Sequence, residues 1–427
     1  MISEDKLEKL QELDVDVPSN LYNKIIAKSQ VDIKSRHPFK FVMNVTIILV
    51  LIISSSIILL SSRSNQDKVP YIHRANISYA GSAVDLLDHT LETMFIRSAI
   101  ALAGKKNTVY SPITDYLNLL MTASGSSTNT SLIGDLGYSD YEAMMAVYKN
   151  YMESINFITE DGLTSIKSFS ALALVDVPQY RDDGLKKLCK NGYISSIHAT
   201  VSDLYKTART LFNAEIGLDM DFESILKTVT ENNIVAFTGL TLVDSFSEYK
   251  KATFANSRIL FNNEKQVDGL RSTEMVNGYF KDETIEMVNF SINCTDLIFI
   301  VPSNDINTFD ISSINLSWMT QKFGTLEVPY FDVDTTIDTT DMNESILSPY
   351  IIMEDIGMED YEFANSFCQS KFEFDEGGVK GQAIAVSIAI PTSAPSEPEF
   401  HFIVDRPFYF ISSYQGIPLF IGKIISL

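Results

Sequence analysis

A long hydrophobic run lies near the start of the chain. Residues 41–60, FVMNVTIILVLIISSSIILL, contain no charged side chain, and about 20 helical residues cross a hydrocarbon layer of about 30 Å. Lysine and arginine crowd the upstream flank, whereas the near downstream side has only Arg63 and Lys68. Because positive charge marks the cytoplasmic side, the run predicts a single transmembrane helix with the N-terminus in the cytoplasm and the rest of the chain extracellular. A cleaved secretory signal fits less well, since forty residues precede the run and no clear small-residue cleavage site follows it.

Beyond this run the hydrophobic pattern changes from helix-like to strand-like. Apolar residues recur at helical spacing over 86–102 and stop before Gly104, and Ser139 with Glu142 predicts a capping box for a second helix. Further helices are expected near 202–212 and 221–229, and strand-like runs follow at 234–243, 257–262, 296–302 and 326–333. Helices first and strands later, without regular alternation, predict an α+β domain with large antiparallel or mixed sheets.

These patterns divide the chain into a cytoplasmic tail (1–40), a transmembrane helix (41–60), a polar linker (61–80) and one large domain (81–427). The formal net charge is -22, and the tail holds seven acidic and seven basic residues, so the whole excess lies beyond it. An acidic surface of that size repels phosphate backbones. We therefore expect no nucleic-acid partner. The tail and anchor favour a bacterial cell surface.

The chemically reactive side chains form no recognisable catalytic or metal-binding pattern. Cys189, Cys294 and Cys368 are too few for a disulfide framework and lack zinc-site spacing, so we expect buried free thiols. Four histidines lie beyond the hydrophobic run, and none has a Gly-x-Ser-x-Gly or His-Glu-x-x-His context. We expect no enzymatic activity, no cofactor and no metal.

The last sixty residues carry the most informative motifs. Residues 371–380 read KFEFDEGGVK, and GQAIAVSIAIPTSAPSEPEFHF and IVDRPFYFISSYQGIPLFIGKIISL follow. This stretch resembles the C-terminus of the serpin family, from the hinge of the reactive loop to the final buried strands. The matching positions are Asp375, Glu376, Gly377 and Gly378 in the hinge, and Asp405, Arg406, Pro407, Phe408, Phe410, Leu419, Phe420, Gly422 and Lys423 in the closing strands.

Upstream pieces occur in the order of the same family. They are NTVYSPI at 107–113, Gly278, Tyr279 and Phe280 followed by LIFIVP at 297–302, and residues 326–331 with Gly357 and Met358. The resemblance spans about residues 80–427 and implies the serpin fold, with helices, three β-sheets and an exposed reactive loop. Three positions depart from the family: its histidine beneath the main sheet is Cys368 here, its tryptophan near the sheet opening corresponds to Leu242, and its asparagine on the strand around Ile234 has no clear match, although Asn232 and Asn233 are near.

The resemblance implies suicide inhibition, in which a protease cuts the loop, forms an acyl-enzyme and is dragged along as the loop enters the main sheet. Because side chains alternate along a strand, the inserting residues that face the core must be small. That set is Val379, Gly381, Ala383, Ala385, Ser387 and Ala389, whereas Lys380, Gln382, Ile384, Val386, Ile388 and Ile390 face the other way. Small residues on one face and β-branched residues on the other favour insertion. The hinge residues implied are Glu376, Gly377, Gly378, Val379, Lys380, Gly381, Gln382 and Ala383.

The spacing of the family from its hinge glutamate implies cleavage between Thr392 and Ser393, with Ala389 as the alternative cleavage residue. No lysine or arginine lies between Gly381 and Arg406. The expected target is therefore an elastase-like or subtilisin-like serine protease, which supplies the catalytic groups. The alternative is a non-inhibitory serpin-fold module that binds a ligand at the surface or signals. In either case we expect a monomer.

Overall fold

The computed structural model describes residues 71–427 except 76, 83–87, 220–222, 349, 351, 359–360, 362 and 380–396. These residues belong to one compact unit, Gln66–Leu427. The predicted tail (1–40) and transmembrane helix (41–60) lie outside the described residues. In the described part of the chain, no helix is both long enough and apolar enough to cross a membrane.

Most helices precede residue 217, as the hydrophobic pattern predicts. The run over 86–102 contains α4 (Asp88–Ala101), whereas in 223–229, the described part of the run predicted at 221–229, the helix covers only Glu223–Leu226. The capping box is wrong: the N–H of Ala143 donates to Asp140 Oδ1 at 2.8 Å, so Asp140 caps α7 (Tyr141–Ser154). The other helices are α5 (Pro112–Ala123), α6 (Thr130–Asp135), α8 (Asp182–Gly192), α9 (Leu204–Ile216), α10 (Glu223–Leu226), α11 (Glu248–Lys251) and α12 (Thr340–Leu347), with 3-10 turns η1 (Ile306–Thr308), η2 (Ile311–Ser313), η3 (Leu316–Trp318) and η4 (Glu354–Ile356).

One sheet, called the main sheet here, has the strand order β1-β5-β4-β6-β14-β13-β12, and β3 pairs with β4. Strands β4 and β5 run parallel, and the other neighbours are antiparallel. The strands are β1 (Tyr71–His73), β3 (Phe157–Ile158), β4 (Thr164–Val175), β5 (Ile194–Ala199), β6 (Asn233–Ser245), β12 (Phe331–Asp338), β13 (Phe367–Asp375) and β14 (Gly378–Val379).

The second sheet has the order β15-β11-β8-β9-β10-β16-β17-β2, with β7 on β8. The family resemblance implies three sheets, but the described strands form two, because the 17-residue β8 pairs with β7 and β11 and, at its end, with β9. The strands are β2 (Thr108–Tyr110), β7 (Ala255–Phe261), β8 (Lys265–Lys281), β9 (Ile285–Ser291), β10 (Asp296–Pro302), β11 (Thr320–Pro329), β15 (His401–Ile403), β16 (Phe408–Tyr414) and β17 (Ile417–Ile424).

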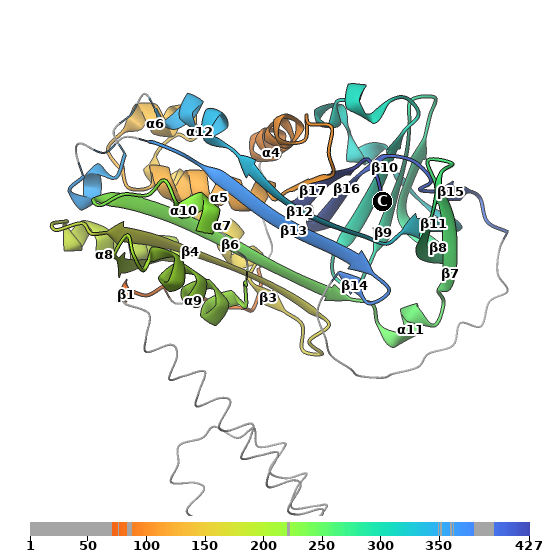
Figure 1. The fold of residues 1–427 in the computed structure, drawn as a ribbon, viewed down its shortest axis with the longest axis horizontal. Helices are drawn as coiled ribbons and strands as arrows, with labels where there is room; N and C mark the ends of the chain where they lie inside the picture. The colour runs from red at the N-terminus through yellow and green to blue at the C-terminus, as the bar shows by residue number, and fades with distance from the viewer. Residues whose placement is uncertain are drawn as a thin grey trace, which may run out of the picture. The chain divides into compact units, whose positions relative to one another are not determined.

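Helices cover the two faces of the main sheet (Figure 1). Helix α5 packs on β6 and on β17, so it lies between the two sheets in the largest apolar cluster. The opposite face of β4 and β6 forms a separate apolar cluster with α9. There the rings of Phe169 and Phe212 meet edge to face at 5.5 Å. A Cβ on Gly239 would lie 2.6 Å from Phe212, so the close fit of α9 on β6 needs glycine at this position.

The last part of the predicted linker belongs to the folded domain. Residues Tyr71–His73 form β1, which pairs with β5 at the edge of the main sheet. Further on, Ala80 bridges to Phe157. The hydrophobic pattern misses this strand because three residues are too few for an alternation to show.

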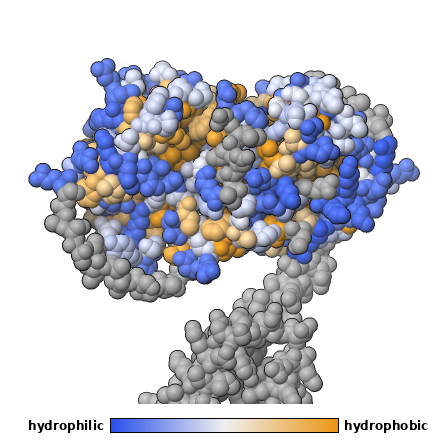
Figure 2. Space-filling view, turned by 180° about the vertical axis from the view of Figure 1, so that it is seen from behind, coloured by the Kyte–Doolittle hydropathy of each residue, from blue (hydrophilic) through white to orange (hydrophobic). Residues whose placement is uncertain are grey.

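Charged and polar groups dominate much of the described surface. In the view from behind, hydrophilic residues predominate toward the margins and hydrophobic residues show as smaller patches (Figure 2). On β12 and β13, Asp332 lies opposite Glu373, and Asp334 lies opposite Lys371. The first pair places like charges opposite each other, and the second places opposite charges opposite each other.

Candidate functional site

The candidate site is the hinge, where the chain leaves β13 and starts a new strand. After β13 the chain turns at Glu376 and Gly377, and the N–H of Gly377 donates to Asp375 Oδ1 at 2.7 Å. The next two residues, Gly378 and Val379, form β14 between β13 and β6. The hinge predicted from the sequence therefore starts in the main sheet. The other predicted site residues, Lys380, Gly381, Gln382, Ala383, Thr392 and Ser393, lie outside the described residues.

Gly378 adopts a backbone conformation that other residues rarely take. Its φ angle is +117°, and a Cβ placed there would lie 2.5 Å from the carbonyl oxygen of Asp244. Any side chain would therefore strain the turn and push β14 off β6. Gly377 differs, because a Cβ there would meet only the flexible end of Asp375.

Within the described part of the chain, the strands on either side of β14 have long edges without a strand partner. Strand β6 pairs with β4 from Asn233 to Asp244, but its other edge pairs only with β14, at 244–245. Strand β13 pairs with β12 along its length and with β14 only at 374–375. Among the described residues, the facing edges 233–243 and 367–373 thus have no strand between them. Figure 1 shows β14 at the end of these two long strands.

A buried carboxylate holds the end of β6 beside the hinge. Asp244 accepts hydrogen bonds from the N–H groups of Asn293 at 3.2 Å and Thr295 at 2.8 Å, and from the Thr295 hydroxyl at 2.6 Å. Its other oxygen accepts from Thr164 at 2.5 Å. Burial raises the pKa of this carboxyl, and the hydrogen bonds oppose that rise. Asp244 thus fixes the β9–β10 turn to the strand that pairs with Val379.

Aromatic rings fill the space under the hinge. Phe246 packs edge to face on Phe374, with ring centroids 6.3 Å apart, and its N–H donates to the carbonyl of Gly377 at 2.9 Å. Lys250 lies 4.3 Å from the ring centroid of Phe290, and burial lowers its pKa. The aromatic side chain beside the hinge is therefore Phe246. The sequence resemblance instead assigned the family's tryptophan position to Leu242.

A second buried network lies under β12 and β13. Arg97 of α4 donates to Asp115 of α5 from Nε at 2.9 Å, and also to the amide oxygen of Asn343 in α12 at 2.5 Å. The Tyr110 hydroxyl donates to the same carboxylate at 2.6 Å. Cys368 is buried nearby, and burial raises the pKa of its thiol to about 12. A charged network thus stands close to the position where the family places a histidine.

The thiols give a direct check on this packing. Cys189 and Cys368 are buried, as expected, but Cys294 is exposed. We expect iodoacetamide to label one thiol per native chain and three after denaturation, measured as intact mass. The variant Cys294→Ser should lose the native label, while rapid labelling of Cys368 would contradict the packing beneath β13.

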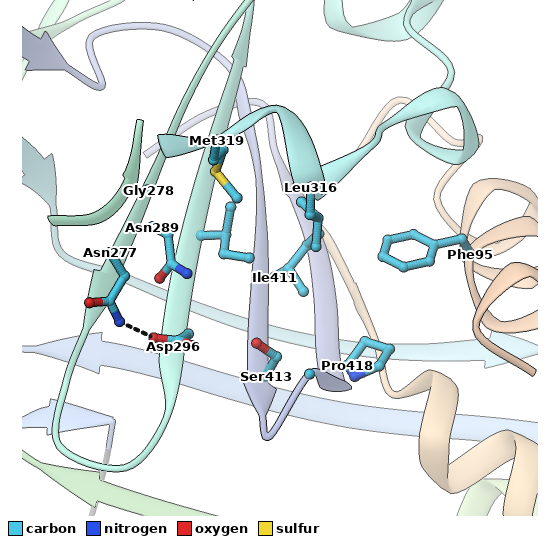
Figure 3. A pocket seen from close by; sticks show the side chains of 12 residues that line it. Phe95, Asn277, Gly278, Asn289, Asp296, Leu316, Met319, Ile411, Ser413 and Pro418 are labelled. Carbon is cyan, nitrogen blue, oxygen red and sulfur yellow. Dashed lines mark hydrogen bonds between the residues drawn. The ribbon is translucent and has the colours of Figure 1, made fainter. Parts of the chain in front are cut away.

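A cavity of about 200 Å³ lies away from the hinge, between α4 and the second sheet. Figure 3 shows Phe95, Leu316 and Met319 on its apolar side and Asn277 hydrogen-bonded to Asp296 on its polar side. Among the described residues, the Oδ1 atom of Asn289 is buried and accepts no hydrogen bond. An unpaired acceptor beside apolar side chains suits a small, mostly apolar ligand with a donor group.

Comparison with known proteins identifies the fold. No known family profile and no curated protein matches the sequence. Solved serpins match the structure: native tengpin, a thermophilic serpin, has a TM-score of 0.63 at 16% identity, covering 83% of this chain and 97% of tengpin. Serpin48 from the insect Tenebrio molitor has a TM-score of 0.63 at 17% identity, covering 80% and 100%. Human thyroxine-binding globulin complexed with its hormone has a TM-score of 0.61 at 15% identity, covering 79% and 96%.

The described domain therefore has the α+β serpin fold. Proteins with this fold are generally inhibitors or carriers rather than enzymes.

The sequence analysis did not identify the residues that pack beside the hinge, which are Asp244, Phe246 and Lys250. Asp244 had a visible signal, because a lone carboxylate at the end of the apolar run over 234–243 calls for buried partners. Phe246 and Lys250 had none, since their contacts join α11 and β9 to the main sheet across long stretches of chain.

Proposed function

We propose that this protein is a suicide inhibitor of extracellular serine proteases. The observation that carries this proposal is β14, whose two residues pair as a strand between β6 and β13. Beyond β14, the facing edges of these strands have no other strand partner among the described residues. A sheet that pairs with the first two residues of the segment is suited to take up more, because each further residue pairs exposed backbone groups.

The register of β14 extends to the far end of β6. Val379 lies opposite Asp244, so Ile390 would lie opposite Asn233, the first residue of β6. Pro391 comes next and has no N–H to donate. Residues 378–390 thus match the 13 residues of β6 one for one, and the proline falls where the ladder must stop.

In this register, small residues meet the packed interior. Ile234 and Leu240 of β6 belong to the core cluster that contains α5. Ala383 would lie beside Leu240, and Ala389 beside Ile234. Because alanine adds little volume above a packed helix, entry would require little displacement of α5.

Larger residues would meet the opposite face. Phe237 of β6 belongs to the apolar cluster under α9, and Val386 would lie beside it. Nearer the hinge, Lys380 would lie opposite Glu373, which itself lies opposite Asp332. A lysine there would place opposite charges next to each other across the two strands.

We further propose that the target cuts between Thr392 and Ser393, with Ala389 as the alternative cleavage residue, and that it is elastase-like or subtilisin-like. Residues 41–60 would anchor the protein in the cell membrane, with the N-terminus in the cytoplasm and the serpin domain outside. The absence of lysine and arginine between Gly381 and Arg406 supports the protease class. The uncharged run and its positive upstream flank support the anchor and its orientation.

The test is to incubate the full-length chain, in mild detergent, with pancreatic elastase and with subtilisin. We expect a covalent adduct that survives boiling, a released C-terminal peptide that begins at Ser393, and a large rise in the thermal midpoint of the cleaved chain. Denaturing gels and intact mass measure the first two, and a thermal scan measures the third. Trypsin is the matched control and should form no adduct through this segment. Complete cleavage without an adduct would contradict inhibition of these proteases.

The cavity in Figure 3 favours a second candidate function, a non-inhibitory ligand-binding module. It combines an apolar wall with the unpaired acceptor of Asn289 among the described residues, and thyroxine-binding globulin, which has the same fold, is seen in complex with thyroxine. A module of this kind would be cut without forming an adduct and would gain no heat stability. The same experiment therefore separates the two functions.

A further inference from the structure

A second cavity, of about 280 Å³, lies beside the end of the second sheet. Three stretches that are far apart in the chain form it: the turn after β7, the chain from the end of β10 into η1, and the segment that joins β15 to β16. The N–H of Asn262 in the first stretch donates to the carbonyl of Asp405 in the third at 2.7 Å, which fixes these two walls to each other. Drug-sized ligands usually occupy about 300–1,000 Å³, so this volume suits a smaller molecule.

One wall of the second cavity carries a positive charge, on Arg406. Its Nη1 atom donates to Asp405 Oδ1 at 3.0 Å, and its Nε atom donates to the carbonyl of Pro302 at 3.4 Å. In the described part of the chain, its Nη2 atom has no acceptor. The Arg406 side chain is therefore held in place by two contacts and still offers a charged donor group to a carboxylate.

Another wall carries a negative charge, on Asp305. Its Oδ1 atom accepts from the N–H of Asn307 at 3.0 Å and from the side-chain amide of the same residue at 2.9 Å. The hydrogen bond from the Asn307 N–H lowers the pKa of Asp305, and the nearby Lys423 and Lys105 add to this effect, so the carboxylate is ionised at neutral pH. Its Oδ2 atom accepts no hydrogen bond from the residues that the structure describes.

The two charges do not neutralise each other. Arg406 forms its ion pair with Asp405, and the described residues include no ion pair between Arg406 and Asp305. A ligand with a single charge would be attracted to one of these groups and repelled by the other, whereas a ligand with both charges would be attracted to both. Apart from side-chain amides, the remaining lining is apolar and consists of Pro302, Ile306, Pro407 and Ile425.

From this arrangement we infer that the second cavity binds a free aliphatic amino acid. The carboxylate of the ligand is bound by Arg406, its ammonium group by Asp305, and its side chain packs against the prolines and Ile425. A free amino acid carries both charges on one carbon atom, whereas a residue at the end of a peptide carries only one of them. The inference goes beyond the proposed protease inhibition and does not depend on it.

The test titrates the full-length chain, in mild detergent, with L-leucine in an isothermal titration calorimeter. We expect saturable binding at one site and a rise in the thermal midpoint, because a ligand that binds only the folded chain stabilises it. Leucinamide lacks the carboxylate and 4-methylpentanoate lacks the ammonium group, so each should bind about tenfold more weakly than leucine or worse. If either analogue binds as tightly as leucine, or if leucine does not bind, the inference is overturned.

Two variants place the binding in this cavity. Asp305→Asn keeps the oxygen that accepts from Asn307, and Arg406→Met removes the guanidinium; each should raise the dissociation constant of leucine about tenfold or more. In Asp305→Asn, leucine and 4-methylpentanoate should bind equally, a change in selectivity that a merely structural role would not produce. The control Arg209→Ala alters an exposed charge on α9 and should bind leucine as the wild-type chain does. Wild-type affinity in both cavity variants would show that leucine binds elsewhere.

Discussion

Replacing Gly378 with valine is expected to lower the yield of covalent protease adduct to about a tenth of the wild-type value or less. Valine at a φ of +117° costs roughly 1–3 kcal/mol in backbone strain, and its Cβ would lie 2.5 Å from the Asp244 carbonyl oxygen. Since about 1.4 kcal/mol is tenfold in rate, insertion slows while hydrolysis of the acyl-enzyme does not. The protease is then released and the chain behaves as a substrate.

The yield is measured by densitometry of boiled gels at a fixed ratio of protease to chain. Gly377→Ala is the matched control one residue away, because its Cβ would meet only the side-chain oxygen of Asp375, and it should keep most of the wild-type yield. Equal yields from Gly378→Val and the wild-type chain would show that insertion does not begin from the register of β14.

Replacing Asp115 with alanine should lower the free energy of unfolding by about 3–5 kcal/mol, the usual cost of leaving one member of a buried ion pair alone. The side chains of Arg97 and Asp115 are 6% and 2% exposed. Without the carboxylate, the guanidinium keeps Asn343 as a partner but has no counter-charge, and the Tyr110 hydroxyl loses its acceptor.

Urea unfolding followed by circular dichroism measures this loss. Arg209→Ala breaks the exposed Arg209–Asp219 pair, whose side chains are 48% and 56% exposed, and should change stability by less than about 1 kcal/mol. The double variant Arg97→Met with Asp115→Leu should recover much of the loss, since it removes both charges. If Asp115→Ala costs no more than Arg209→Ala, the network does not hold α4 in place.

The sequence predicted those elements whose pattern is local. The apolar spacing over 86–102 became α4, because one buried face repeats with the helical period, and the nearly uninterrupted apolar runs at 234–243 and 296–302 became β6 and β10. Strand β4 was not predicted. Its residues 168–175 are buried on both faces, so polar and apolar positions do not alternate along it.

In the candidate site, too, only the residues with a local sequence signal could be predicted. Glu376, Gly377, Gly378 and Val379 were recognisable because they lie in a short contiguous motif that resembles the hinge of the serpin family. Phe246 carried no signal, since its partner rings Phe290 and Phe374 follow it by more than 40 residues. The number of sheets could not be predicted from the sequence either. It depends on whether β8 stays one continuous strand while it pairs with different partners along its length.

If the proposed inhibition takes place, the length of β6 also determines how far a captured protease would travel. With Val379 paired at Asp244 and Ile390 due opposite Asn233, the acyl bond at Thr392 would end just past the start of β6. Thirteen residues at about 3.3 Å each span roughly 40 Å. The protease would therefore move along the full length of β6 and stop at the end of the main sheet where β4 ends at Val175. Its catalytic serine would still be esterified to Thr392.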